Sequence, residues 1–125
     1  MELSNFEISK IVSYATKCHT GELVDKLVNC RHDDPHDRSD RAEIVALATA
    51  IAIRNGVRTV SVKSPFRAIY SNTNHLVDKV QEKWYSSMNE QERKKKIAHY
   101  CAGIAIRNGV HDYFPLLVKL IIKIV

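Results

Sequence analysis

Glycine, proline and aromatic residues are scarce in this sequence. Four glycines and three prolines among 125 residues allow few turns, which argues against an all-β fold and favours long helices. Aromatic residues make up 7% of the chain and do not alternate with basic residues, so base stacking is not indicated. No apolar run approaches the ~20 residues that a membrane-spanning helix needs. We therefore expect an all-α protein without a transmembrane segment.

Cysteine is also rare, with only Cys18, Cys30 and Cys101 in the chain. The first ten residues, MELSNFEISK, carry no charged segment followed by an apolar one, so no secretion signal is predicted. The cysteines are then expected to be free thiols in a reducing compartment, the cytoplasm first and the nucleus as the alternative.

The remaining composition is that of an ordinary globular domain. Hydrophobic residues make up 45% and charged residues 26%, and the length suits a single domain over residues 1–125. The formal net charge of +5 favours acidic partners such as nucleic acid.

Two sequence motifs occur twice, 53 positions apart. The segment IAIRNGV stands at Ile51–Val57 and at Ile104–Val110, and LVDK stands at Leu23–Lys26 and at Leu76–Lys79. Two matches at one offset indicate an ungapped internal duplication, which is typical of stacked helical units.

The duplication predicts a three-helix unit with a period of 53, in copies at about 4–57 and 58–110, followed by a terminal apolar helix at 111–125. The whole would be a compact helical bundle or a short α-solenoid. In the first copy, apolar residues at helical spacing predict three helices: one opening at Ser4 and Glu7, one after a break at Thr20 and Gly21, and one starting near Asp40. In the second copy, Ser64 with Pro65, Asn74 and Asn89 mark the corresponding helix starts.

The last helix of each copy has the clearest end. Gly56 and Gly109 are predicted to adopt the left-handed conformation that stops a helix, and Arg54 and Arg107 place positive charge at the negative end of the helix dipole. Both helices are apolar on nearly every side, which predicts that they lie at the centre of the fold with Cys101 as a core residue. The recurring pairs suggest a contact between Asp25 and Arg54, and likewise between Asp78 and Arg107.

Two basic clusters predict a nucleic-acid surface. The candidate residues are Arg58, Lys63, Arg67, Arg93, Lys94, Lys95 and Lys96. The second cluster opposes the dipole of its own helix. No residue of either cluster has a structural role in the sequence, so we expect these residues to neutralise phosphates. The preferred function is sequence-independent RNA backbone binding, a class in which we include viral-type accessory and silencing-suppressor proteins. The alternative is a helical-repeat module that binds a partner protein.

The apolar C-terminal stretch has three interpretations. Residues 116–125 carry only Lys119 and Lys123 as polar residues. They can pack on the repeats, form a homodimer seam, or lie on a membrane surface, although no aromatic anchor supports the last.

Metal and catalytic sites are weakly indicated. Cys18, Cys30, His32 and His36 are zinc-type ligands, but the two cysteines lie at opposite ends of one predicted helix, and a solvated loop is the simpler interpretation. None of the six histidines stands in a nucleophile or acid–base signature, and no glycine-rich phosphate motif occurs. We expect a protein that is not an enzyme and has no metal or cofactor.

Overall fold

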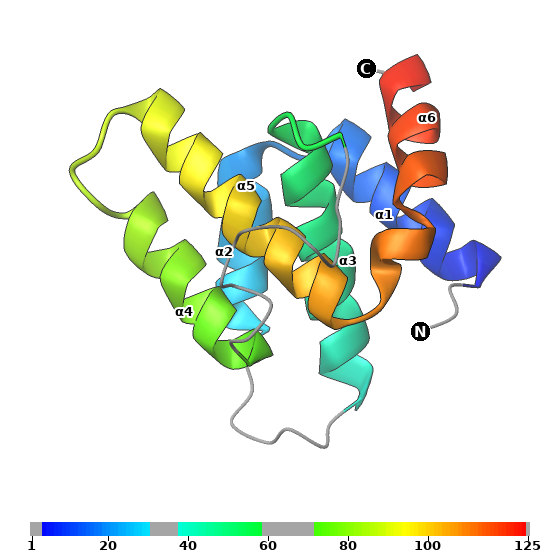
Figure 1. Cartoon of the computed structure of the whole chain (residues 1–125), viewed down its shortest axis with the longest axis horizontal. Coiled ribbons are helices and arrows are strands. Elements are labelled where there is room, and N and C mark those ends of the chain that lie inside the picture. The colour runs from blue at the N-terminus through cyan, green and yellow to red at the C-terminus, as the bar shows by residue number, and fades with distance from the viewer. Residues whose placement is uncertain (1–3, 31–37, 59–71, 125) are drawn as a thin grey trace.

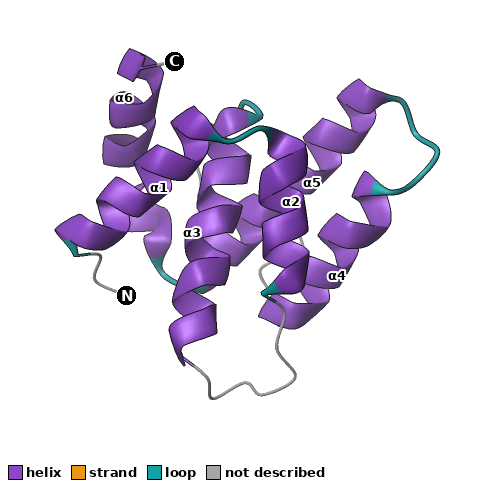
Figure 2. Ribbon diagram, turned by 180° about the vertical axis from the view of Figure 1, so that it is seen from behind, coloured by secondary structure: helices purple, strands orange, loops and turns teal. Residues whose placement is uncertain are grey.

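The computed structural model describes residues 4–30, 38–58 and 72–124, and all regular structure in these ranges is helical. The all-α prediction is confirmed (Figures 1 and 2). Among the described residues, no helix is long and apolar enough to cross a membrane. The elements are α1 (Asn5–Lys17), α2 (Thr20–Asn29), α3 (Arg38–Arg54), α4 (Thr73–Trp84), α5 (Glu90–Arg107), η2 (Val110–Asp112) and α6 (Phe114–Ile124).

The centre of the molecule is formed by α3 and α5, which cross each other (Figure 1). Helix α3 also packs against α1 and α2, while α4 packs against α5 and α2. Every residue from Ile44 to Ile53 is buried, as is every residue from Cys101 to Ile106. This burial confirms the prediction that both of these helices are central. Cys101 is a core residue, and burial raises the pKa of its thiol.

Short polar side chains begin three helices. The Ser4 Oγ accepts a hydrogen bond from the Glu7 N–H (3.2 Å), and the Asn89 Oδ1 accepts one from the Glu92 N–H (2.9 Å). Both caps were predicted. Asn72 caps α4 by accepting from the His75 N–H (2.7 Å), so this helix begins close to its predicted start.

Two predicted boundaries in the first half are wrong by about two residues. Helix α1 ends at Lys17, and Thr20 and Gly21 are the first residues of α2 instead of a break. Helix α3 begins at Arg38, before the predicted Asp40. The Glu43 side chain, expected to cap that start, instead binds Tyr14 and Lys10 of α1.

Both central helices end at the predicted glycines. Gly56 has φ +104° and Gly109 has φ +80°. The Val57 N–H donates to the Ala52 carbonyl (3.0 Å) and the Gly56 N–H donates to the Ile53 carbonyl (3.3 Å). These two bonds make a Schellman motif, so the left-handed helix stop is confirmed.

The same side-chain contact occurs within each of the two helix pairs, α2–α3 and α4–α5. The Asn55 Nδ2 donates to the Thr20 Oγ1 (3.2 Å), and 53 positions later the Asn108 Nδ2 donates to the Thr73 Oγ1 (3.3 Å). The predicted helix at Ser64 and Pro65 lies outside the described residues. The three-helix unit with a period of 53, and the copy boundaries drawn from it, therefore stay predictions.

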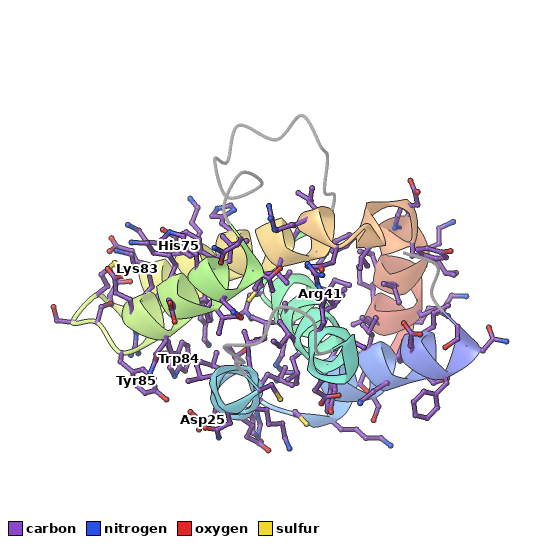
Figure 3. All side chains as sticks on the ribbon, turned by 90° about the horizontal axis from the view of Figure 1, so that it is seen from below. Asp25, Arg41, His75, Lys83, Trp84 and Tyr85 are labelled. Carbon is purple, nitrogen blue, oxygen red and sulfur yellow. The ribbon has the colours of Figure 1, made fainter. Side chains whose placement is uncertain are left out.

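The proposed contact between Asp25 and Arg54 does not account for either side chain. The Asp25 carboxylate accepts a hydrogen bond from the Tyr85 hydroxyl (2.6 Å), which joins α2 to the end of α4 (Figure 3). The Arg54 Nη1 donates to the Ala15 carbonyl (2.9 Å). Arg54 thus connects the ends of α3 and α1, whereas Asp25 connects α2 to the end of α4.

Helix α6 packs on α1, as the first of the three interpretations requires. Phe114, Leu117 and Ile121 form its buried stripe. Leu116, Leu120 and Ile122 remain 47%, 36% and 49% exposed, so the helix keeps an outer apolar surface.

Candidate nucleic-acid interface

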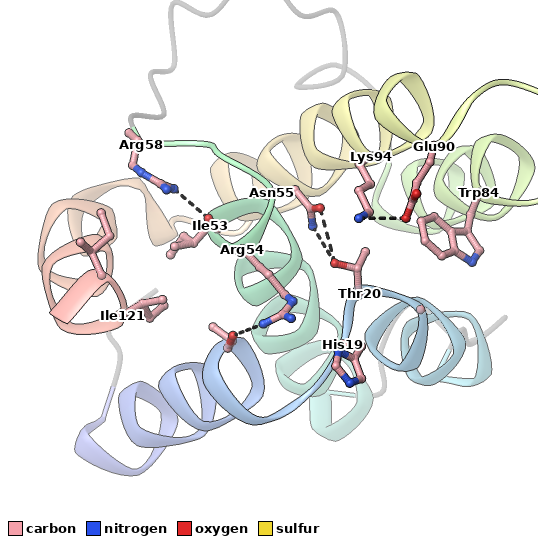
Figure 4. Close-up of a pocket in the computed structure, with 13 residues that line it drawn as sticks. His19, Thr20, Ile53, Arg54, Asn55, Arg58, Trp84, Glu90, Lys94 and Ile121 are labelled. Atoms are coloured by element: carbon pink, nitrogen blue, oxygen red, sulfur yellow. Dashed lines mark hydrogen bonds and ion pairs between the residues drawn. The ribbon is translucent and has the colours of Figure 1, made fainter. Parts of the chain in front are cut away.

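A cavity of about 640 Å³ lies where six helices meet (Figure 4). Its wall is formed by the junction of α1 and α2, the ends of α3 and α4, the first turns of α5, and α6. The charged side chains of the wall are Arg54, Arg58, Lys94 and Glu90, with His19 beside them. With Arg and Lys counted as cations and Glu as an anion, the described residues of the wall carry two more positive than negative charges.

Arg54 is fixed at this wall by the end of α1. Its Nη1 donates to the Ala15 carbonyl (2.9 Å), which is one of the last carbonyls of α1 and has no partner inside its own helix. The guanidinium also stands at the end of α3, so it lies near the negative ends of two helix dipoles. The sequence predicted only the second of these roles.

Arg58 is fixed in a similar way at the end of α3. Its Nη1 donates to the Ile53 carbonyl (2.8 Å) and, more distantly, to the Val57 carbonyl (3.3 Å). The expectation that Arg58 has no structural role is therefore wrong. Its guanidinium keeps N–H donors on Nε and Nη2 and lines the cavity.

Lys94 reaches the cavity from the first turns of α5. Its Nζ lies 3.1 Å from an oxygen of Glu90, one turn earlier in the helix. Such exposed pairs contribute only a few tenths of a kcal/mol, so a stronger anion can replace the carboxylate. Lys94 is the member of the 93–96 run that lines the cavity.

Polar and apolar residues fill the wall between these charges. The Asn55–Thr20 contact lies between Arg54 and Lys94 in Figure 4. Isoleucines 53, 121 and 122 form the part of the wall near α6, and Trp84 stands at the other end beside Glu90. The cavity is therefore cationic in its middle and aliphatic at one end.

The four basic residues of the run 93–96 do not form one surface. Successive helical residues differ by about 100°, so four of them pass nearly once around α5. The Arg93 Nη1 donates to the Trp84 carbonyl (3.1 Å), and the guanidinium lies 5.2 Å from the Trp84 ring centroid. Arg93 therefore ties α4 to α5, contrary to the expectation that it has no structural role.

The other two lysines of the run are on the outside of α5. Lys95 and Lys96 are exposed. His99, one turn after Lys95, has a lowered pKa because of burial and, second, because of the Lys95 charge. Lys95 and Lys96 thus extend the positive charge of Lys94 over the surface of α5.

The rest of the predicted site residues are only partly described. Lys63, Arg67, His32 and His36 lie outside the described residues. Cys30 is the half-buried residue that ends α2, and Cys18 is the half-buried residue that ends α1. In the part of the chain that is described, no group of three or more His, Cys, Asp or Glu residues could hold a metal ion.

A second polar cluster joins α1 to α3. The Tyr14 hydroxyl donates to the Glu43 carboxylate, which also pairs with Lys10. Burial, followed by the bond to Glu43, raises the pKa of Tyr14. Burial alone would raise the pKa of Glu43, but the hydrogen bonds from Lys10 and Tyr14 outweigh it and hold that pKa below its ordinary value. The cluster is a structural ion pair and contributes nothing to the cavity.

Comparison with known proteins gives no relative: no family model, no curated protein and no solved structure matches this chain.

Proposed function

We propose that this protein is a non-enzymatic binding protein whose ligand is nucleic acid, RNA first, held through its phosphate backbone without sequence recognition. The observation that carries the proposal is the meeting of Arg58 and Lys94 at one cavity with Arg54. These residues come from separate parts of the sequence, and they gather at the end of α3 and the start of α5. A cytoplasmic location, expected from the sequence, suits this ligand and remains a prediction.

The basic side chains of the cavity suit the phosphates of a nucleic acid better than the carboxylates of a partner protein. Guanidinium groups donate several hydrogen bonds in a fixed plane, which matches phosphate oxygens. Lys95 is exposed next to Lys94 on α5, where a polyanion that extends beyond the cavity can reach it, and the exposed Lys96 adds positive charge farther around the helix. Each neutralised phosphate releases counterions, so the affinity should depend on salt.

The aromatic residue at the cavity supports backbone contact over base recognition. Trp84 has the Arg93 guanidinium over its ring, and its Cζ2 faces α2, 3.5 Å from where a Cβ on Gly21 would stand. Because Arg93 lies over one face of the ring, that face is closed to a stacked base. The binding is therefore expected to be tolerant of sequence.

The test is a titration with a short RNA duplex at about 50 and about 200 mM salt. We expect steep weakening, and we expect the triple variant Lys94→Gln, Lys95→Gln, Lys96→Gln to lower the salt slope by about one unit for each phosphate that these lysines neutralise in the unmodified protein. The matched control removes the same charge elsewhere, with Lys26→Gln, Lys79→Gln and Lys83→Gln, none of which lines the cavity. Absence of binding at low salt by the unmodified protein would refute the proposal.

The second candidate function is a protein-interaction module. The observation that favours it is the outer face of α6, where Leu116 and Leu120 lie one turn apart and are exposed. The same face is the predicted homodimer seam. Sedimentation of the protein and of Leu116→Glu with Leu120→Glu tests that role. This function would be favoured over RNA binding if the unmodified protein is a dimer, the double variant is a monomer, and binding to a partner protein does not depend on salt.

A further inference from the structure

We infer that the cavity binds the phosphomonoester of a nucleotide, which is either the phosphorylated end of an RNA strand or a free nucleotide. The inference deepens the proposed function and, for the strand end, rests on it. It assigns the cavity to a terminal group, while the exposed Lys95, next to Lys94 on α5, is available to the phosphates that follow.

The volume favours a terminal group over a continuous backbone. About 640 Å³ lies within the ~300–1,000 Å³ typical of small-ligand sites. A duplex backbone runs past a surface and contacts only the rim of such a space, where it can meet the charged side chains. A strand end or a single nucleotide can enter it.

The charge of the wall favours a monoester over a diester. Among the described residues of the wall, Arg54, Arg58 and Lys94 are opposed by Glu90, which leaves two positive charges. A phosphomonoester carries a charge of about −1.5 to −2 near pH 7, whereas each backbone phosphodiester carries one. The monoester therefore matches the wall more closely and can compete with Glu90 for Lys94.

The two arginines are held in place before any ligand arrives. Arg54 is anchored by the Ala15 carbonyl and Arg58 by the Ile53 carbonyl. These partners are neutral, so both guanidinium groups keep their full charge. Anchoring lowers the entropy that binding would otherwise cost. Since one N–H direction is used by each carbonyl, donors on the other nitrogens remain available to phosphate oxygens.

The aliphatic end of the cavity suits the rest of the nucleotide. Ile53 and Ile121 line the wall on the α6 side of Arg54 (Figure 4), and Ile122 also lines the cavity. Ile122 is 49% exposed, so a base placed against it buries apolar surface that is now open to water. Aliphatic contact on a base face carries no sequence information, in agreement with the sequence-independent binding proposed above.

The experiment compares a short single-stranded RNA bearing a 5′-phosphate with the same strand bearing a 5′-hydroxyl, by calorimetry at about 50 mM salt. We expect the phosphorylated strand to bind about tenfold more tightly, the value of a charge-assisted hydrogen bond. Adenosine monophosphate should compete with the phosphorylated strand and remove its advantage over the 5′-hydroxyl strand. Lys94→Gln should abolish most of it, while Lys83→Gln, outside the cavity, should keep it; thermal unfolding of each variant verifies the fold.

The outcomes separate the inference from the proposed function. Equal affinity for the two strands, with salt-dependent RNA binding intact, overturns the inference and keeps the function. Binding of adenosine monophosphate that Lys94→Gln abolishes, with no RNA binding at low salt, overturns the function and assigns the cavity to a free nucleotide. The inference is also overturned if neither the RNA strands nor adenosine monophosphate bind. Binding of decanoate, a fatty-acid anion without phosphate, in place of the nucleotide overturns it too.

Discussion

The Asn55 side-chain amide donates a hydrogen bond of 3.2 Å to the Thr20 hydroxyl and so ties the end of α3 to the first residue of α2. The same amide donates to the Ile51 carbonyl (2.8 Å). Asn108 makes the same two bonds, to Thr73 (3.3 Å) and to the Ile104 carbonyl (2.7 Å). Arg41 of α3 also donates to the Asn108 Oδ1 (2.9 Å). Each helix pair is therefore closed by an asparagine just after its central helix.

Asn55→Ala and Asn108→Ala should each lower the free energy of unfolding by about 1–3 kcal/mol, because each leaves a buried threonine hydroxyl without its side-chain partner. Both threonines are buried, at 7% and 9% exposure, so water cannot fully replace the amide. Urea denaturation measures the decrease. Asn29→Ala, at an exposed position on α2, is the control and should change stability by less than about 0.5 kcal/mol.

Much of the fold was predictable because its signals are local or periodic. The glycine at position 56 and the caps at Ser4 and Asn89 require only neighbouring residues, and the buried central helices were evident from apolar residues on every side. The start of α2 was misplaced because Thr20 and Gly21 resemble a break when taken alone. The Glu22 carboxylate accepts a hydrogen bond from the His19 N–H (3.3 Å), so the local signal for this start lies at Glu22. The contact from Thr20 to Asn55, 35 positions later, has no local signal.

The central helices should be sensitive to a decrease in side-chain volume. Ile51→Ala and Ile104→Ala should each cost about 2–5 kcal/mol, since both side chains are fully buried and their removal leaves cavities. Chemical denaturation of the two variants gives the values. A decrease below about 0.5 kcal/mol at both positions would contradict the packing of α3 against α5.

Gly56→Ala should destabilise the protein by about 1–2 kcal/mol through backbone strain alone. A Cβ at this position would meet nothing within 4 Å, while φ is +104°, so sterics with other residues do not contribute. Gly21→Ala is the matched control: it lies in α2, where a Cβ would make ordinary contact with Trp84 at 3.5 Å, and alanine favours a helix. Calorimetric melting should show a lower Tm for the first variant and an unchanged or higher Tm for the second.

The Tyr14–Glu43 contact should make part of the stability depend on acid. The folded pKa of Glu43 is lowered, so its contribution is complete above the ordinary carboxyl pKa and is lost as pH falls through the folded value. A double-mutant cycle with Tyr14→Phe and Glu43→Gln should give a coupling of about 0.5–3 kcal/mol at neutral pH. Repeating the cycle near pH 3, below the ordinary carboxyl pKa of about 4.3, should shrink the coupling. A coupling that does not change with pH would show that the carboxylate charge is irrelevant.

The candidate site was only half predictable. Basic composition directed attention to Arg58 and to the run 93–96, but a charge cluster in sequence does not say which residues of a helical turn face which way. Lys94 lines the cavity and Arg93 does not. In the sequence, the dipole of α3 already explained why an arginine stands at position 54. The position of Arg54 beside α1 depends on its contact with Ala15, 39 positions away. The cavity itself has no sequence signal, because six elements contribute to it.

Arg93 should act on the fold and not on RNA. Its guanidinium bonds the Trp84 carbonyl and covers the Trp84 ring, so Arg93→Gln should cost about 1–3 kcal/mol of unfolding free energy. Because Trp84 is the single tryptophan of the chain, its fluorescence reports the change directly. Arg93→Lys keeps the charge but cannot reproduce the planar contact, and we expect it to lose stability too. RNA affinity and its salt slope should match the unmodified protein in both variants. A normal melting curve combined with a slope reduced by about one unit would instead identify Arg93 as a phosphate contact.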